Sequence, residues 1–197
     1  MIEIVLGVDP SLRDTGLCLV GLYEKFVVFD RIHFDNSIGD KTFEGVYNRV
    51  SEVDRDFRYF LDLYCPDIVI MESPLPSGLM SPALSALATK LVTTTLDIYP
   101  GMFMMHPSYL RYVLGKSRYT RKDIGDLTSQ IIEEEGFNTS TTRYSADEGV
   151  AFLLAYRMLI KLGYESKIES KIFTAEKERY LAKSEEFQES HLQRILT

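Results

Sequence analysis

The sequence predicts an α/β fold built on a mixed, five-stranded sheet with helices on both faces. Residues 2–8, 15–22 and 25–34 form three apolar runs joined by short connections, which is typical of antiparallel strands. From residue 42 onward, apolar residues instead recur every three or four positions, as they do along one face of a helix. Helical and strand-like segments then alternate to about residue 162, which indicates a sheet covered by helices.

The elements after residue 34 are expected in a definite order. Pro66 and Gly163 are placed to end two of the helices, since proline cannot continue a helix and glycine favours the conformation just past its end. We expect a long helix at 42–64, a strand at 67–72, a loop at 73–78, a helix at 79–97, a strand at 101–105, a short helix at 107–114, a helix at 120–135 and a core helix at 145–162.

The domain organisation follows from length and periodicity. A chain of 197 residues and 22.6 kDa has the size of one domain. Residues 1–163 contain the strongly periodic segments and are expected to form that domain. Residues 164–197 alternate acidic and basic residues around apolar positions at loose helical spacing, which predicts a charged, helical C-terminal extension.

Composition excludes several classes of protein. With 45% hydrophobic and 26% charged residues, the chain is neither disordered nor fibrous. No apolar run reaches about eighteen residues and no basic leader is visible, so we expect a cytoplasmic protein without a membrane partner. Cys18 and Cys65 lie in apolar segments and are expected to be reduced and buried. The formal net charge of −7 argues, at face value, against a nucleic-acid partner.

Three acidic residues are expected to meet at one rim of the sheet. Asp9 and Glu72 each follow a strongly apolar strand, so they lie side by side if the first and fourth strands are parallel neighbours. Asp147 is in the first turn of the apolar core helix, which packs on the sheet. Oxygen ligands alone favour Mg²⁺ or Mn²⁺. Taken singly, Asp9 could be a turn starter and Asp147 a residue that favours the helix dipole.

Glu148 has two interpretations of equal weight. Ser145 and Glu148 match the S-x-x-E pattern of a capping box, in which the two side chains satisfy backbone N–H groups at a helix start. Glu148 is also next to Asp147 and could serve as a further metal ligand.

Four blocks of sequence together resemble a known family. They are Leu6-Gly7-Val8-Asp9-Pro10-Ser11 with Thr15-Gly16, then Pro66-Asp67-Ile68-Val69-Ile70-Met71-Glu72, then His106-Pro107-Ser108 leading into Gly115-Lys116-Ser117-Arg118-Tyr119-Thr120-Arg121-Lys122, and finally Ser145-Ala146-Asp147. Their order and spacing resemble the RuvC-type Holliday-junction resolvases of the RNase H-like superfamily, over residues 2–163. The extension beyond residue 163 lies outside the resemblance and is compatible with a phage or viral member, acting in the bacterial cytoplasm or an infected host cell.

The resemblance implies a homodimeric, Mg²⁺-dependent endonuclease that nicks opposed strands of a four-way DNA junction. The family's catalytic acids fall on Asp9, Glu72 and Asp147, and its lysine falls on Lys122. Two metal ions per site are expected, with Mn²⁺ able to substitute, and Asp9 is the candidate to bridge them. The family often has an acid or a histidine three residues before the last aspartate. Here that position holds Tyr144, so Glu148 is the nearest substitute as a fourth ligand.

A second departure concerns the loop after Glu72. Family members can carry an aromatic residue three positions after the glutamate, and here that position is Leu75, between two prolines. Junction handling and cleavage preference are therefore expected to differ. The helices at 42–64 and 79–97 are the candidates for the dimer interface.

Residues 111–122 are the expected DNA contact. Five basic residues and no acid occur there, with Tyr112 and Tyr119 interleaved as possible stacking surfaces. The alternative is a solvated basic helix face. The basic residues are Arg111, Lys116, Arg118, Arg121 and Lys122, and Arg13 and Lys90 are weaker candidates. His33, His106 and His191 do not form a metal-binding set and are expected to be structural or on the surface.

Other functions remain open or are disfavoured. An RNase H-like nuclease acting on flaps, forks or RNA–DNA hybrids would use the same acids, and a non-catalytic DNA-binding homologue would keep only the basic contacts. An ATPase of the actin and sugar-kinase type also begins with a strand, an aspartate and a turn, but it needs two such domains, and 197 residues are too few.

Overall fold

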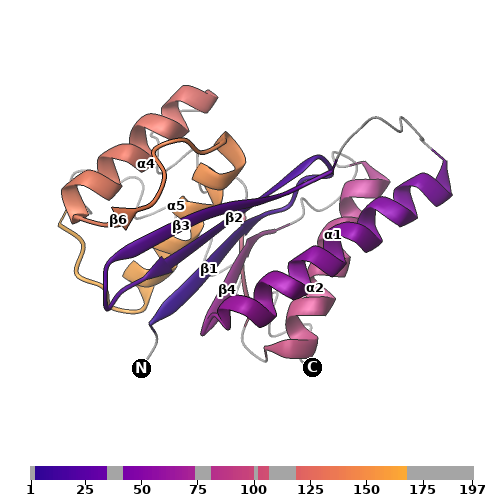
Figure 1. Ribbon diagram of the computed structural model, residues 1–197, viewed down its shortest axis with the longest axis horizontal. Helices are drawn as coiled ribbons and strands as arrows, with labels where there is room; N and C mark the ends of the chain where they lie inside the picture. Colours follow the sequence, from indigo (N-terminus) through magenta and orange to yellow (C-terminus); the bar gives the residue numbers. More distant parts are fainter. Residues whose placement is uncertain (1–2, 35–41, 74–80, 100–101, 107–118, 168–197) are drawn as a thin grey trace.

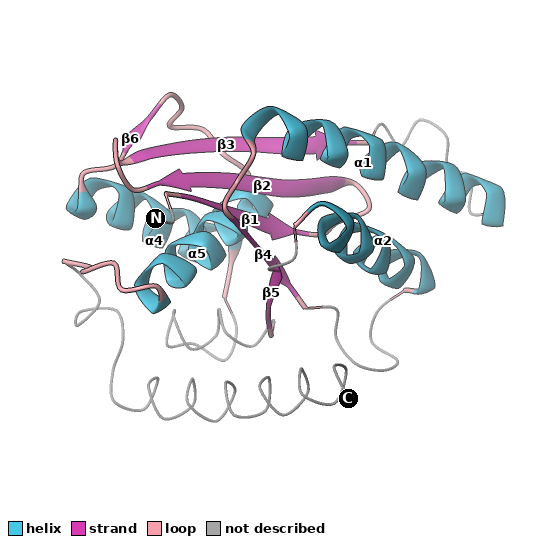
Figure 2. Ribbon diagram, turned by 90° about the horizontal axis from the view of Figure 1, so that it is seen from below, coloured by secondary structure: helices cyan, strands magenta, loops and turns pink. Residues whose placement is uncertain are grey.

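The structure is a computed structural model that describes residues 3–34, 42–73, 81–99, 102–106 and 119–167. The strands are β1 (Ile4–Asp9), β2 (Asp14–Gly21), β3 (Phe26–His33), β4 (Ile68–Glu72), β5 (Met102–Met105) and β6 (Asn138–Thr139). The helices are α1 (Phe43–Tyr64), α2 (Pro82–Ile98), α4 (Arg121–Glu135) and α5 (Ala146–Lys161). In this part of the chain α1 and α2 cover one face of the sheet and α4 and α5 the other, which confirms the expected α/β class (Figures 1 and 2).

The strand order places several strand ends along one edge. Over the described residues the order is β5-β4-β1-β2-β3-β6. β1 pairs antiparallel with β2 and parallel with β4, while β3 is antiparallel to β2 and β5 is parallel to β4. The carboxyl ends of β1, β3, β4 and β5 and the amino end of β2 therefore lie together. We call this edge the carboxyl edge.

The sixth strand was not predicted, and the expected count of five was wrong for the described residues. β6 has two residues, which is too short to show any alternation of apolar and polar positions. It forms because Gly136 ends α4 in the left-handed region, at φ 74°, and turns the chain back along β3. The backbone N–H of Asn138 then donates to the carbonyl of Lys25 at 2.6 Å.

Capping boxes begin the two helices nearest the carboxyl edge. Thr120 and Asp123 form one at the start of α4, and Ser145 and Glu148 form the other at the start of α5. Most of α5 is buried, because apolar side chains surround it and fill the core between the sheet and α4.

Two glycines let α5 lie directly on the sheet. A Cβ at Gly7 would be 1.8 Å from the carbonyl oxygen of Ala151, and one at Gly16 would be 2.3 Å from the carbonyl carbon of Asp147. No side chain fits at either position, so the glycines bring the first two turns of α5 onto β1 and β2. This contact fixes the position of Asp147 relative to the carboxyl edge.

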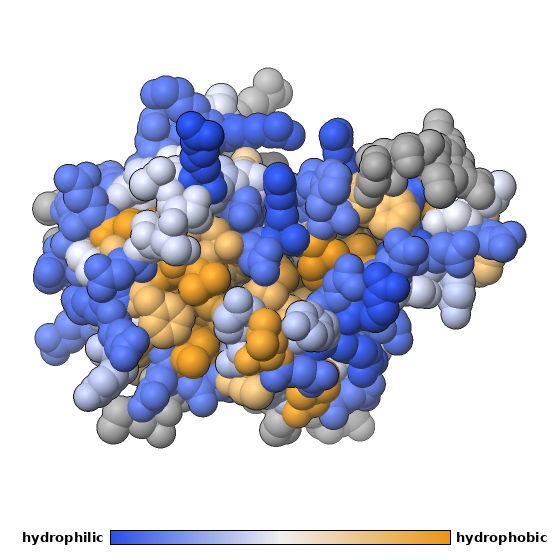
Figure 3. Space-filling view, in the orientation of Figure 1, coloured by the Kyte–Doolittle hydropathy of each residue, from blue (hydrophilic) through white to orange (hydrophobic). Residues whose placement is uncertain are grey.

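On the opposite face, a buried acid joins α1 to α2. Asp54 accepts a hydrogen bond from the hydroxyl of Thr94, and its Oδ2 lies 3.3 Å from both Arg58 Nε and Lys90 Nζ. Lys90, a weaker candidate for DNA contact, is thus paired with Asp54 in the contact between α1 and α2. Figure 3 shows hydrophobic side chains gathered over the middle of the molecule, on the side seen in Figure 1. A second hydrophobic core fills the space between the sheet and these two helices, and Ile4, Phe26 and Val28 are partly buried against it.

The remaining expectations have mixed outcomes. Cys18 is buried as predicted, but Cys65 is exposed, because it is the residue that ends α1, in the left-handed region at φ 43°. The expected short helix at 107–114 and the extension beyond residue 167 lie outside the described residues. In the part of the chain that is described, no helix is long and apolar enough to cross a membrane.

Candidate functional site

Asp9 and Glu72 are neighbours on the carboxyl edge. β1 and β4 are parallel and in register, with Val8 opposite Met71, so the next residue of each strand emerges at the same place. The two carboxyl groups are within hydrogen-bonding distance of each other. The side-by-side placement expected from the sequence is therefore confirmed.

The electrostatics of this pair show a third carboxylate nearby. Burial, followed by the charges of Glu72 and Asp147, raises the pKa of Asp9 well above its usual value. Burial also raises the pKa of Glu72, where the hydrogen bond from Asp9 opposes the rise and Asp147 adds to it. Three acids that repel one another at a protein edge are stabilised when a cation lies between them.

Asp147 reaches this site from the first turn of α5. Burial raises the pKa of its half-buried carboxyl, and Arg121, the first residue of α4, acts in the opposite direction. Asp14 and Glu148 add to the rise. Arg121 is thus the cation that most strongly favours the ionised form of Asp147.

These side chains line one pocket of about 210 Å³, which is the space of about seven water molecules. Its lining residues are Asp9, Glu72, Tyr119, Arg121, Ile124, Ala146, Asp147 and Val150. The charged donors are all carboxylate oxygens, and this donor set suits Mg²⁺ or Mn²⁺. Over the described residues, no three acidic, histidine or cysteine side chains are already grouped as a finished metal cluster.

Glu148 is used as a helix cap. Its Oε2 accepts a hydrogen bond from the backbone N–H of Ser145 at 2.5 Å, and its own N–H donates to Ser145 Oγ at 3.2 Å. The capping-box interpretation is confirmed, and Glu148 is not among the residues that line the pocket. A role as metal ligand stays a prediction, and it would require this carboxylate to leave its cap.

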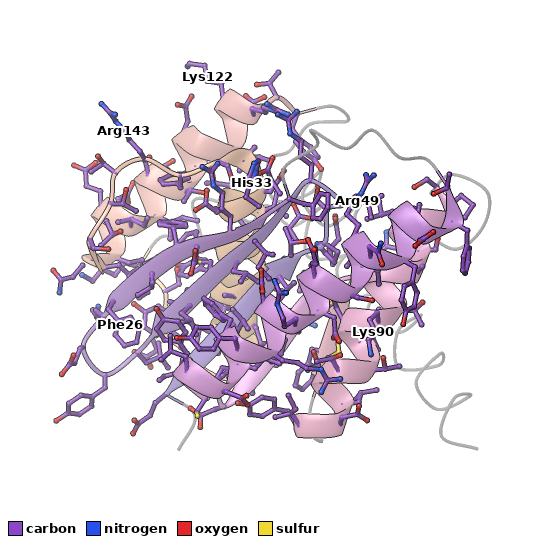
Figure 4. The ribbon with its side chains drawn as sticks, turned by 45° about the vertical axis from the view of Figure 1, so that its right-hand side comes forward. Phe26, His33, Arg49, Lys90, Lys122 and Arg143 are labelled. Atoms are coloured by element: carbon purple, nitrogen blue, oxygen red, sulfur yellow. The ribbon has the colours of Figure 1, made fainter. Side chains whose placement is uncertain are left out.

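The structure brings Arg121 into the pocket and leaves Lys122 outside it. Successive residues of a helix point about 100° apart, so only one of the two can face the acids. Lys122 is 84% exposed and pairs with Asp126 one turn further along, at 3.0 Å. Figure 4 shows it projecting outward from the start of α4. Of the other expected basic contacts, Arg111, Lys116 and Arg118 lie outside the described residues.

Tyr144 braces the site instead of facing it. Its ring stacks on Phe29 of β3, with ring centroids 4.4 Å apart. Its hydroxyl donates to the carbonyl of Gly125 at 2.9 Å and lies 2.6 Å from Ser129 Oγ, so it is directed towards α4. The sequence indicated only that Tyr144 stands where the family often has an acid or a histidine, and it did not reveal this role. Phe29, on the face of β3 that packs against α5, was the available signal.

Comparison with solved structures defines the class of fold. The chain is similar to RuvC of Thermus thermophilus, solved alone and in complex with a Holliday junction substrate, with a TM-score of 0.58 in both cases. Identity is 12% and 13%, over 83% of this chain and 98% of RuvC. Fowlpox virus resolvase, in complex with Holliday junction DNA, matches with a TM-score of 0.51 and 16% identity, over 80% of this chain and 99% of the resolvase.

The fold is therefore RNase H-like, as the four sequence blocks implied. In particular, it is the arrangement found in RuvC and in a poxvirus resolvase. No protein-family model and no curated protein matches the sequence.

Proposed function

We propose that this chain is a divalent-metal-dependent endonuclease that resolves four-way DNA junctions. The observation that supports this most directly is the meeting of Asp9, Glu72 and Asp147 at one pocket of a RuvC-like fold. Both similar proteins were solved with Holliday junction DNA, which makes a branched DNA the first substrate to test.

The three carboxylates are proposed to hold two Mg²⁺ ions, for which Mn²⁺ can substitute. Asp9 stands between Glu72 and Asp147 in electrostatic terms, since both raise its pKa, and it is the proposed bridging ligand. Ions bound there would supply an activated water and would stabilise the leaving oxygen of the phosphodiester.

Arg121 is the proposed catalytic cation. Arg121 lines the pocket and its charge acts on Asp147, so its guanidinium is proposed to contact a phosphate oxygen and to stabilise the charge that develops during cleavage. Lys122, expected in this role, is proposed instead as a contact to phosphates outside the pocket, and Arg111, Lys116 and Arg118 stay proposed DNA contacts. These contacts are local, so a chain of net charge −7 should bind plain duplex weakly.

Paired nicking requires two active sites, so we infer a homodimer with α1 and α2 as the proposed interface. Residues 1–163 are the proposed nuclease domain and residues 164–197 an accessory extension. Sedimentation at micromolar concentration tests the dimer, since a monomer would count against paired nicking.

The function is tested with a panel of labelled DNAs in Mg²⁺: a four-way junction, a fork, a flap, an RNA–DNA hybrid and a plain duplex. We expect symmetric nicks in the junction, and their loss in Glu72→Gln. Glu133→Gln is the matched control, because it makes the same chemical change on the exposed face of α4. Normal cutting by Glu72→Gln would contradict the site, and a preference for hybrid, flap or fork would assign a different RNase H-like activity.

A further inference from the structure

A histidine–aspartate pair lies on the carboxyl edge, beyond the pocket. His33 ends β3 and Asp14 begins β2, and the two residues are opposite each other in the antiparallel register. His33 Nδ1 lies 2.5 Å from Asp14 Oδ1, while Arg13 Nε lies 3.6 Å from Asp14 Oδ2. Half of the His33 side chain is exposed, against 23% for Asp14.

The pair lies on the same face of the sheet as α5. Side chains alternate along a strand, and Cys18 and Val20 of β2 pack in the core that contains α5, so Asp14 faces the same way. Gly16, the next residue of β2 on that face, lies directly under Asp147. Asp14 also contributes to the raised pKa of Asp147, so the two carboxylates are within electrostatic reach. Figure 4 shows His33 at the upper edge of the sheet, beneath the helix that carries Lys122.

The strand order sets the spacing from the pocket. Glu72, Asp9, Asp14 and His33 end or begin four adjacent strands, in that order. β3 is two strands from β1, and His33 lies two residues further out than Asp9, which amounts to about 10–12 Å. A DNA strand advances about 3.4 Å along the helix axis per phosphate, but it also winds around that axis, so successive phosphates are farther apart than this and the distance spans about two of them.

Asp14 determines what the imidazole can do. Because Nδ1 is engaged with the carboxylate, Nε2 is the ring nitrogen left for a ligand. When the ring is protonated, its Nε2–H is a charge-assisted donor to an anionic oxygen such as that of a phosphate. The nearby Arg13 adds a second cation at the same place, held by the other oxygen of Asp14.

We propose that His33, positioned by Asp14, binds a backbone phosphate about two nucleotides from the phosphate that is cut. This inference rests on the proposed function. It extends the DNA path along the carboxyl edge to β2 and β3, on the side away from Glu72. The competing account is that the pair only fastens the open end of the β2–β3 hairpin, where the N–H of Phe34 already donates to the carbonyl of Arg13 at 2.8 Å.

The test measures junction affinity as a function of salt concentration, in a Glu72→Gln background that blocks cleavage. His33→Ala is expected to weaken binding by about 3- to 10-fold at low salt and to reduce the salt slope by about one phosphate contact. His33→Lys should restore most of the affinity, because it replaces the cation, and Asp14→Asn should give an intermediate loss. Lys161→Ala, at the far end of α5 from the pocket, is the matched control and should match the parent.

Melting temperatures separate contact from folding. A loss in His33→Ala that His33→Lys rescues supports the contact even if both variants melt earlier. A loss that His33→Lys does not rescue, or an unchanged affinity and slope in His33→Ala, overturns it. If the parent protein binds and cuts the junction while His33→Ala behaves normally, only this inference fails. If the parent neither binds nor cuts, the proposed function itself fails.

Discussion

Arg121 and Asp147 stand in the first turns of two different helices, yet they line the same pocket, and Arg121 opposes the rise that burial causes in the pKa of Asp147. The relationship depends on two capping boxes, since Thr120 starts α4 and Ser145 starts α5 at the same edge of the sheet. The pocket therefore contains an arginine as well as three acids, and this arginine acts on Asp147, the least buried of the three carboxylates.

The first prediction separates Arg121 from its neighbour Lys122. Arg121→Gln should slow single-turnover junction cleavage by about 10²–10³, the usual cost of removing one group that stabilises developing charge. It should also move the acidic limb of the pH profile to higher pH, because Asp147 loses the cation that limits the rise of its pKa. Lys122→Gln should stay within a few fold of the parent at saturating DNA. The reverse ranking would return the catalytic role to Lys122.

The second prediction concerns the stability of the metal-free protein. The folded state raises the pKa of Asp9, so the stability that goes with its protonated form is complete below the unfolded pKa and is lost as pH rises through the folded pKa. Asp9→Asn removes this loss and should melt higher than the parent at pH 7 in EDTA. Each 1 kcal/mol corresponds to about 2–4 °C in a domain of this size.

The controls for this second prediction vary the pH and the Mg²⁺ concentration. The difference between Asp9→Asn and the parent should shrink towards about pH 3, which is below the pKa of an unfolded aspartate, so that Asp9 is protonated in both states. Mg²⁺ should raise the melting temperature of the parent and have little effect on Asp9→Asn. An equal response of both proteins to Mg²⁺ would place the metal elsewhere.

The third prediction concerns Glu135, the last residue of α4, which holds the segment after α5. Its buried carboxylate accepts hydrogen bonds from Tyr156 Oη at 2.7 Å, Ser166 Oγ at 2.9 Å, Tyr164 Oη at 3.0 Å and the N–H of Lys167 at 2.8 Å. Glu135→Gln should lower the free energy of unfolding by about 1–3 kcal/mol, because an amide cannot accept all four. Cleavage at a permissive temperature should stay normal, since Glu135 is at the end of α4 away from the pocket.

The pH dependence of this effect has a definite sign. Burial alone would raise the pKa of Glu135, but its four hydrogen bonds lower it below the usual value. Its contribution is therefore present above the unfolded pKa and is lost as pH falls through the folded pKa. The parent and Glu135→Gln should converge in acid, and thermal melts from pH 7 to pH 3 measure this. Equal melting temperatures at pH 7 would contradict the account of this anchor.

The fourth prediction tests Tyr144 as a brace. Tyr144→Phe keeps the stack on Phe29 and removes only the hydroxyl that reaches Gly125 and Ser129, so it should cost about 0.5–1.5 kcal/mol of stability. The Mg²⁺ concentration needed for half-maximal cleavage should not change. A large rise in that concentration would make Tyr144 a metal ligand after all.

Sequence patterns predicted the sheet and the meeting of the acids, because both depend on local signals. Apolar strands that end in Asp9 and Glu72, and an apolar helix that begins before Asp147, have few ways to pack. The features that local patterns did not predict depend on how the elements are arranged in three dimensions. Whether Arg121 or Lys122 faces the pocket depends on the rotation of α4 about its axis, and Cys65 is exposed because of how α1 ends. The pairing of Asp14 with His33 depends on strand register, which no single segment encodes.

The most direct test of the central claim is cleavage of a four-way junction in Mg²⁺ by the parent and by Asp9→Asn, with binding measured in parallel. The account predicts symmetric cutting by the parent, and no cutting but undiminished binding by Asp9→Asn, because neutralising an acid removes a metal ligand without removing a phosphate contact. Cutting by Asp9→Asn at the parent's rate would contradict it.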